Sequence, residues 1–198
     1  MGETAGGWTP MGARTLPEKG RTAVVEPVPG EVVTFLEMTS PEQLRAGRVA
    51  DGLTLSATND EALVRATIVR VGAPYRWPSA GWGDPAWAEW FADPRHQSFL
   101  LRSGDDVAGI VETTAHPPYE VEIISFGLVP EYVGAGIGGH ALTLAARLAW
   151  NLKHPALDEV RRVWLHTSTL DHPNALRNYV NRGFHPYRTQ TRGHVAPG

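Results

Sequence analysis

The chain of 198 residues has no cysteine, no long apolar run and no marked excess of charge, and each absence removes a class of function. Without cysteine there is no disulfide, no thiolate metal ligand and no thiol nucleophile. No apolar run approaches the length of a membrane span, and the N-terminus lacks the hydrophobic core of a signal peptide, so we expect a cytoplasmic protein. With 18 Lys and Arg against 21 Asp and Glu, we expect no nucleic-acid or membrane partner and a small-molecule ligand instead.

Hydrophobic residues make up 42% of the chain, which is enough for the core of one domain. Residues 1–30 mix Gly, Pro, Thr and charged residues without a helix or strand period, so we expect a loose N-terminal extension there. The remaining residues, 31–198, then form a single domain. No His and Glu stand at zinc-binding spacing, and we expect no metal site.

Strand and helix signals alternate along the domain. The apolar run Val32–Met38 predicts a strand, and Ser40–Gln43 supplies an N-cap, a proline and a capping-box glutamine that predict a helix directly after it. The next signals predict a helix over 60–71 and a second helix that begins at Asp84. Three strands follow within 97–115 and 119–129, and a hairpin turn at 103–106 joins the first two. The last signals predict a helix over 137–152, a buried strand over 162–169, a helix from Asp171 to Gly183 and an edge strand over 184–191.

Four tryptophans lie in or near the predicted helix that begins at Asp84. Trp87 and Trp90 have helical spacing, which favours a place in the core. Trp77 and Trp82 lie in a Gly- and Pro-rich loop, where they fit two roles equally well, as caps over the core or as a wall of a substrate pocket.

The segment Val133–Gly139, VGAGIGG, is typical of an anion-binding loop, because glycines let backbone N–H groups approach a phosphate and a helix begins directly after them. Its glycines match the dinucleotide pattern G-x-G-x-x-G, but Pro130–Val133 separates them from the preceding strand, and the candidate ribose ligand, Asp171, lies far beyond the roughly 20 residues expected. The segment is not a P-loop, because no Gly-Lys-Ser/Thr follows.

Two segments resemble the GNAT acyltransferase superfamily. Leu128–Gly138, LVPEYVGAGIG, is similar to motif A of that family, V-x-P-x-x-R-G-x-G-I-G. Within 163–184, the spacing of Ala175, Tyr179 and Gly183-Phe184 is similar to A-x-x-x-Y-x-x-x-G-F of motif B. The resemblance covers about residues 32–190, and it implies an α/β fold with a mixed, mainly antiparallel sheet flanked by helices and with two strands splayed at an acyl-CoA cleft.

The chain departs from the family pattern at two positions. Val133 stands where the family usually has Arg or Gln, and His172 stands where motif B often begins with Asn, with Asn174 two positions later. Because backbone N–H groups make most of the pyrophosphate contacts, we expect Val133 to weaken cofactor binding without abolishing it.

The resemblance implies an N-acetyltransferase that moves an acetyl group from acetyl-CoA to a primary amine of a small molecule. Because the chain has no cysteine to carry an acyl group, we expect direct attack in a ternary complex. By register the Leu128 N–H faces the thioester carbonyl as an oxyanion donor, and Gly127 eases the bend of its strand. The expected cofactor-binding residues are Phe126, Gly127, Leu128, Val133, Gly134, Ala135, Gly136, Ile137, Gly138, Gly139, Thr167, His172, Asn174 and Tyr179.

Tyr179 occupies the position of the family's general acid, although a core tyrosine on an amphipathic helix would fit the same position. Strand alternation places Glu122, Ile124 and Phe126 on one face, and Glu122 lies where histone-acetylating relatives carry a general base. An exposed strand residue is the equal alternative for Glu122. Glu112 and a water chain are the further candidates for the base.

We expect Trp77, Trp82, Glu112 and His166 to line the acceptor site, with His116 as a further candidate, although a lone histidine is more often structural. An aromatic and acidic site suits an amino sugar, an amino acid, a polyamine or an antibiotic amine alike. The alternatives to an enzyme are a non-catalytic acyl-CoA sensor or partner module and, less well supported, a nicotinamide-binding enzyme. A homodimer would agree with the habit of the family.

Overall fold

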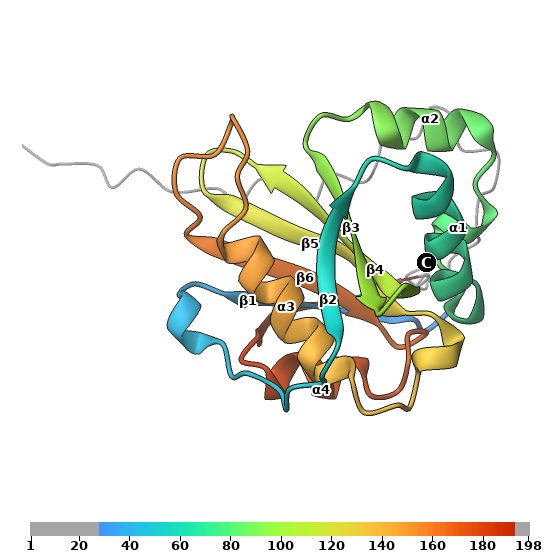
Figure 1. Cartoon of the computed structure of the whole chain (residues 1–198). Helices are drawn as coiled ribbons and strands as arrows, with labels where there is room; N and C mark the ends of the chain where they lie inside the picture. The colour runs from blue at the N-terminus through green and yellow to red at the C-terminus, as the bar shows by residue number, and fades with distance from the viewer. Residues whose placement is uncertain (1–27, 193–198) are drawn as a thin grey trace, which may run out of the picture.

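The computed structural model describes residues 28–192, so nearly all of the predicted N-terminal extension lies outside the described residues. Seven strands form one sheet in the order β2-β3-β4-β5-β6-β1-β7, and only the pair β5 and β6 is parallel (Figure 1). The elements are β1 (Val32–Met38), β2 (Leu53–Thr58), α1 (Glu61–Gly72), α2 (Asp84–Ala92), β3 (His96–Ser103), β4 (Asp106–His116), β5 (Glu120–Leu128), α3 (Gly138–Trp150), β6 (Arg162–Ser168), α4 (Ala175–Asn181) and β7 (His185–Thr191).

Helices cover both faces of the sheet, and each pair of helices encloses its own core. Helices α1 and α2 pack Val64, Ile68 and the buried Trp87 and Trp90 against one face, which confirms the core position predicted for these two tryptophans. Helix α3 packs a stripe of fully buried alanines against the other face, where it meets α4. The mixed α/β architecture with a mainly antiparallel sheet is therefore confirmed.

Local sequence signals located most elements, with two errors around β1. The first strand has the predicted bounds, and the capping box of Ser40 and Gln43 forms. It starts only a 3-10 turn, Pro41–Gln43, because Leu44 adopts extended backbone and ends the helical conformation. Strand β2 was not predicted. Four of its six residues, Leu53–Thr58, carry no large apolar side chain, and it lies at the edge of the sheet.

The prediction that a helix begins at Asp171 was wrong by four residues. Helix α4 begins at Ala175 with Asn174 as its N-cap. The Asp171 carboxylate instead accepts hydrogen bonds from the Ser168 N–H at 2.8 Å and from the Thr167 hydroxyl at 2.7 Å. The Asp171 carboxylate is therefore occupied by groups at the end of β6 and cannot cap the first turn of a helix.

Strands β5 and β6 pair along only part of their lengths. The parallel pairing runs from Glu120 opposite Arg162 to Glu122 opposite Trp164 and then stops. Both strands continue, to Leu128 and Ser168 respectively, without pairing with each other. The splayed strands implied by the family resemblance are thus present, and the parted half of β5 has a free backbone edge.

A β-bulge changes which side chains of β5 share a face. Glu112 of β4 pairs with Ser125 while Thr113 pairs with Ile123, which leaves Ile124 as the extra residue. Ile124 packs on the side of α1, whereas Phe126 packs in the core on the side of α3. The prediction that Phe126 shares a face with Glu122 and Ile124 was therefore wrong, because the bulge reverses the alternation beyond Ile124.

Candidate active site

A continuous cavity of about 2690 Å³ runs from the glycine loop, past the parted strands, onto the sheet face beside α1. This volume well exceeds the roughly 300–1,000 Å³ of a pocket for one drug-sized ligand, so the cavity has room for two molecules at once. The predicted site residues that line it are Trp77, Trp82, Glu112, Glu122, Phe126, Gly127, Leu128, Val133, Gly134, Gly136, Gly138, Gly139, His166, His172, Asn174 and Tyr179, with His116. Ala135, Ile137 and Thr167 do not line the cavity.

The glycine loop presents free backbone at one end of the cavity. Gly134 and Gly136 have φ values of 86° and 79°, which side-chain-bearing residues rarely adopt, and a Cβ at either would meet no atom within 4 Å. Helix α3 follows at Gly138, and its N-cap, Ile137, provides no side-chain hydrogen bond to the first turn. The first N–H groups of α3 are thus available to an anion, and the helix dipole favours negative charge there.

The parted half of β5 also presents backbone groups to the cavity. The Val129 N–H donates to the Ala108 carbonyl at 3.0 Å, and backbone direction alternates along an antiparallel strand. The N–H and C=O groups of Leu128 and Phe126 therefore point away from β4, toward the gap beside β6. Gly127 has no positive φ. A side chain at Gly127 would overlap Val71 of α1.

Tyr179 of α4 closes one side of the parted strands. Its ring contacts Phe126 edge-on at a centroid distance of 6.2 Å, and the residue is only 7% exposed. Burial raises the pKa of the Tyr179 hydroxyl, and the nearby Asp171 carboxylate raises it further. The hydroxyl is therefore protonated at neutral pH and can donate a proton or a hydrogen bond into the cavity.

A tryptophan bridges the two sides of the gap. The indole N–H of Trp77 donates to Asp171 at 3.0 Å, and its ring lies beside Gly127 and Gly72. Trp77 thus joins the loop after α1 to the segment after β6, whereas Trp82 packs against Trp87 and Trp90, with ring centroids 5.1 and 5.3 Å away. Both tryptophans line the cavity, and both also pack against the core beneath α1 and α2.

The motif B residues beside this bridge differ in their availability. Thr167 is buried, and its hydroxyl is occupied by Asp171. The His172 ring lies edge-on to Tyr75 at 6.2 Å, and its Nδ1 accepts a hydrogen bond from the Asn174 N–H at 3.1 Å. His172 and Asn174 line the cavity and are available to a ligand, whereas Thr167 supports Asp171.

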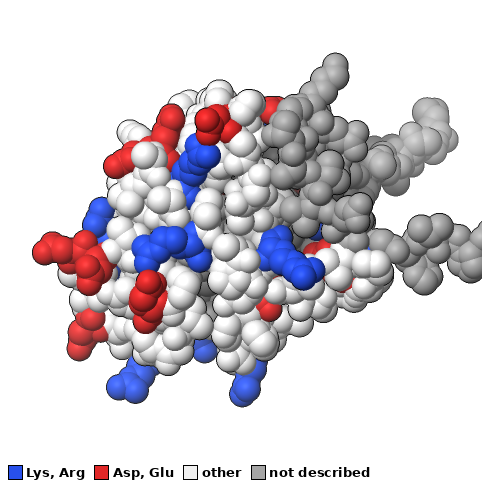
Figure 2. Space-filling model, turned by 90° about the vertical axis from the view of Figure 1, so that its right-hand side faces the viewer, with Lys and Arg blue, Asp and Glu red and all other residues white. Residues whose placement is uncertain are grey.

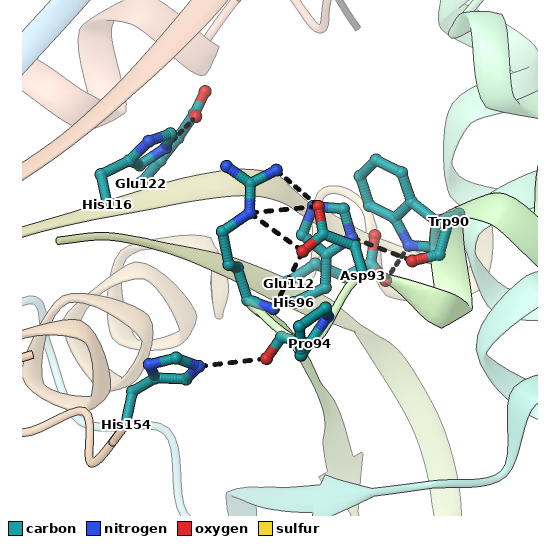
Figure 3. Close-up of polar contacts among 9 residues, drawn as sticks. Trp90, Asp93, Pro94, His96, Glu112, His116, Glu122 and His154 are labelled. Atoms are coloured by element: carbon teal, nitrogen blue, oxygen red, sulfur yellow. Dashed lines mark hydrogen bonds and ion pairs between the residues drawn. The ribbon is translucent and has the colours of Figure 1, made fainter. Parts of the chain in front are cut away.

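Glu122 lies between two histidines on neighbouring strands. Its Oε2 is 3.0 Å from His116 Nε2 (Figure 3), and its Oε1 is 3.5 Å from His166 Nδ1. Burial raises the pKa of the Glu122 carboxyl, but the two histidines outweigh burial, so the pKa lies below its usual value. Glu122 is only 7% exposed and ionised at neutral pH, so it is not the ordinary exposed strand residue that the sequence left open.

Glu112 is the second buried carboxyl of the cavity. Its Oε1 accepts a hydrogen bond from Trp90 Nε1 at 3.2 Å (Figure 3). A second hydrogen bond to Oε1 comes from Ser98 Oγ at 3.0 Å. Oε2 has no hydrogen-bond partner among the described residues, and the residue is 1% exposed. Burial raises the pKa of Glu112 to about 7, although these donors and Ser125 oppose the shift.

One face of the surface carries charged residues of mixed sign. On the face drawn in Figure 2, Lys and Arg are interspersed with Asp and Glu, without a patch of one sign over the described atoms. Residues 28–192 contain no group of three or more His, Asp or Glu side chains placed to hold a metal ion. No helix in this range is long and apolar enough to cross a membrane.

Two features of the site escaped sequence reasoning. Asp171 joins Trp77, Thr167 and Ser168, although its place before a proline suggested a helix cap. The grouping of His116 and His166 around Glu122 had no local signal, because the three residues come from three strands and meet only through the sheet register.

Comparison with known proteins places this geometry in a family. The model of the acetyltransferase (GNAT) family matches residues 66–184, more than half of the chain. Comparison with curated protein sequences gave no match.

Solved structures with the same fold include two GCN5-related N-acetyltransferases. One, from Kribbella flavida, is 19% identical with a TM-score of 0.57, over 81% of this chain and 58% of that one. The other, from Sphaerobacter thermophilus, is 16% identical with a TM-score of 0.56, over 83% and 51%. An aminoglycoside acetyltransferase from an uncultured soil metagenomic sample, in complex with sisomicin, is 12% identical with a TM-score of 0.50, over 67% and 88%.

At these identities the likeness concerns the fold alone, and the chain spans little more than half the length of the first two structures. The family match itself covers α1 through α4 and thus includes the glycine loop, the parted strands and Tyr179. The chain therefore belongs to the GNAT acetyltransferase family.

Proposed function

We propose that the protein is an N-acetyltransferase that transfers an acetyl group from acetyl-CoA to a primary amine of a small molecule. The observation that carries the proposal is the parting of β5 from β6 directly before the glycine loop. This arrangement gives one extended ligand both a free strand edge and a helix N-terminus. Acetyl-CoA has a matching form, because an amide-containing pantetheine arm can pair with a strand edge and a pyrophosphate can bind at helix N–H groups.

The cofactor contacts follow from this geometry. The N–H groups of Gly134 to Gly139 bind the pyrophosphate, and the backbone of Phe126 to Leu128 pairs with the pantetheine arm. Val133 lines the cavity and contributes backbone only, Ala135 and Ile137 hold the shape of the loop, and His172 and Asn174 border the same ligand. The Leu128 N–H points into the gap, where it would stabilise the oxyanion formed when the amine attacks the thioester carbonyl.

Two proton transfers accompany the reaction. The departing CoA thiolate takes a proton from Tyr179, whose hydroxyl is protonated at neutral pH. The amine loses its proton to the group formed by Glu122 and its histidines. Glu112 is the alternative acceptor, and either carboxylate, together with Trp77 and Trp82, suits an acceptor that arrives as a cation.

Binding and turnover test the proposal separately. Isothermal titration should detect acetyl-CoA binding and no NAD binding, and free-thiol release should appear with at least one amine among glucosamine, lysine, spermidine and sisomicin. Absence of acetyl-CoA binding would overturn the proposal. Binding without thiol release from any amine would identify a non-catalytic acyl-CoA sensor.

Tyr179→Phe tests the assignment of the acid. We expect kcat to fall about 10²-fold while the Kd for acetyl-CoA stays nearly constant, because only the proton donor is lost. Tyr132→Phe is the matched control, since Tyr132 does not line the cavity. An unchanged kcat in Tyr179→Phe would assign the tyrosine to the core alone.

A further inference from the structure

Three titratable side chains from adjacent strands form one cluster on the cavity face. His116 of β4 and His166 of β6 approach the two oxygens of Glu122 on β5, at 3.0 and 3.5 Å. Each imidazole also lies against an aromatic ring, His116 against Trp164 at 5.4 Å and His166 against Phe35 at 5.6 Å. The rings are thus held in place from two sides.

The contacts leave the ring nitrogen remote from Glu122 on each histidine, His116 Nδ1 and His166 Nε2, without a hydrogen-bond partner among the described residues. Both oxygens of Glu122 face a histidine, and the carboxylate is almost wholly buried, so it has little access to an incoming amine. His166 directs Nδ1 toward Glu122, and its side chain is 35% exposed. No described residue hydrogen-bonds to His166 Nε2, which is the ring atom remote from Glu122.

His166 also lies at the right place along the sheet. The pairing of β5 with β6 ends at Trp164, so His166 is two residues into the parted half of β6. It therefore borders the same gap as the Leu128 N–H, which points toward β6 from the other side. His116, in contrast, is the last residue of β4 and lies opposite Glu120, where β5 and β6 are still paired.

We propose that His166 Nε2 accepts the proton of the attacking amine, and that Glu122 is a positioning residue for it. This inference rests on the proposed function and names the group that performs its first proton transfer. Glu122 fixes the ring and stabilises the imidazolium, and His116 holds Glu122 in turn. The 3.5 Å separation is long for a hydrogen bond, as is common for catalytic pairs before substrate binds.

The proposed step balances as follows. An acceptor that arrives as an ammonium first gives one proton to bulk water. The lone pair of the neutral amine then forms the C–N bond to the thioester carbonyl carbon while an N–H proton passes to His166 Nε2. The oxyanion then collapses, the C–S bond breaks, and the thiolate takes the Tyr179 proton. Water then reprotonates Tyr179 and accepts the proton from His166.

Other charged groups face the cluster from every neighbouring strand. They are His96 from β3, Glu37 from β1, Arg162 from β6 and Arg188 from β7. Arg162 is paired with Glu37 and Glu120, and Arg188 stacks over Phe35 at 4.2 Å. Glu122 is thus the only carboxylate within 4 Å of an imidazole nitrogen of this cluster among the described residues.

Chemical rescue gives the test. His166→Ala should lower kcat about 10²-fold with the fastest amine of the panel above and leave the Kd for acetyl-CoA unchanged. Added imidazole should raise the kcat of His166→Ala about tenfold or more, because it can enter the open space left by the ring. His185→Ala, on β7 and outside the cavity, is the matched control and should show neither loss nor rescue.

Two further variants separate the roles. His166→Asn places an amide N–H at the position of Nδ1, toward Glu122, without a titratable nitrogen, so we expect a folded protein with the same loss of kcat. Glu122→Gln should lower kcat without rescue by imidazole, because His166 still occupies its place. The inference is overturned if His166→Asn keeps the wild-type kcat, or if imidazole fails to rescue His166→Ala. A wild-type protein that releases no thiol would instead overturn the proposed function.

Discussion

Two buried carboxyls line the same cavity, yet their surroundings drive their pKa values in opposite directions. Glu112 is 1% exposed and Glu122 is 7% exposed, so burial alone would raise both. Glu112 receives hydrogen bonds from neutral donors on Trp90 and Ser98, and its pKa rises to about 7. Glu122 faces two histidines and its pKa is lowered. The hydrogen-bonding partners, rather than the degree of burial, therefore decide which carboxyl carries charge at neutral pH.

The difference assigns the two carboxyls to different tasks. Glu122, which is ionised at neutral pH, stabilises a neighbouring imidazolium, as the relay through His166 requires. Glu112 is close to half-protonated at neutral pH and gains or loses a proton as its surroundings change. Three experiments measure the contrast.

The largest expected effect is on the pH dependence of stability through Glu112. Because its folded-state pKa is raised from 4.5 to about 7, its contribution to stability is full below pH 4.5 and is lost as the pH rises through 7. Glu112→Gln removes this dependence. Between pH 5 and pH 8 the wild type should lose about 2 kcal/mol more free energy of unfolding than the variant, measured by urea denaturation. If the free energy of unfolding changes with pH in the same way in both proteins, Glu112 is ionised over the whole range from pH 5 to pH 8.

The next effect comes from a donor to Glu112. Ser98→Ala removes the hydroxyl that donates to Oε1 at 3.0 Å. At pH 8, where the carboxylate is charged, the free energy of unfolding should fall by about 1.5 kcal/mol, and the loss should be smaller at pH 5. Ser56→Ala, an exposed serine on neighbouring β2, is the control and should change little. An equal loss at both pH values would contradict a titrating Glu112.

The smallest effect comes from a histidine partner of Glu122. His116→Phe keeps a ring against Trp164 but removes the nitrogen that contacts Oε2. The free energy of unfolding at pH 7 should fall by about 1 kcal/mol. Because the pKa of Glu122 is lowered, its contribution is present above its usual value of 4.5 and is lost as the pH falls. The difference from wild type should therefore shrink in acid, and a constant difference would show that only packing changed.

Local patterns were sufficient for most of the fold. The hairpin between β3 and β4, the alanine-rich α3 and the glycine loop all follow from signals within a few residues of each other. Paired motifs at a family spacing predicted the parted strands from the sequence alone. What these features share is that the residues responsible are neighbours in sequence.

The remaining features depend on strands that are distant in sequence. The bulge at Ile124 is set by pairing with β4, and it moved Phe126 to the opposite face. Glu122 could be singled out by its position, but its histidine partners depend on the register of β4, β5 and β6. A single sequence carries no local signal for such pairings, so the electrostatic environment of the site needed the structure.

The position of β1 has a consequence for the order in which the molecule assembles. Val33 pairs with Ser168 of β6 on one side and with Gln190 of β7 on the other. Strand β1 is therefore synthesised well before the two strands with which it pairs. Contacts between such distant residues form slowly. Phe35, which supports His166, belongs to this strand. We therefore expect the acceptor side of the cleft to be completed late in folding, after the glycine loop and α3 are already in place.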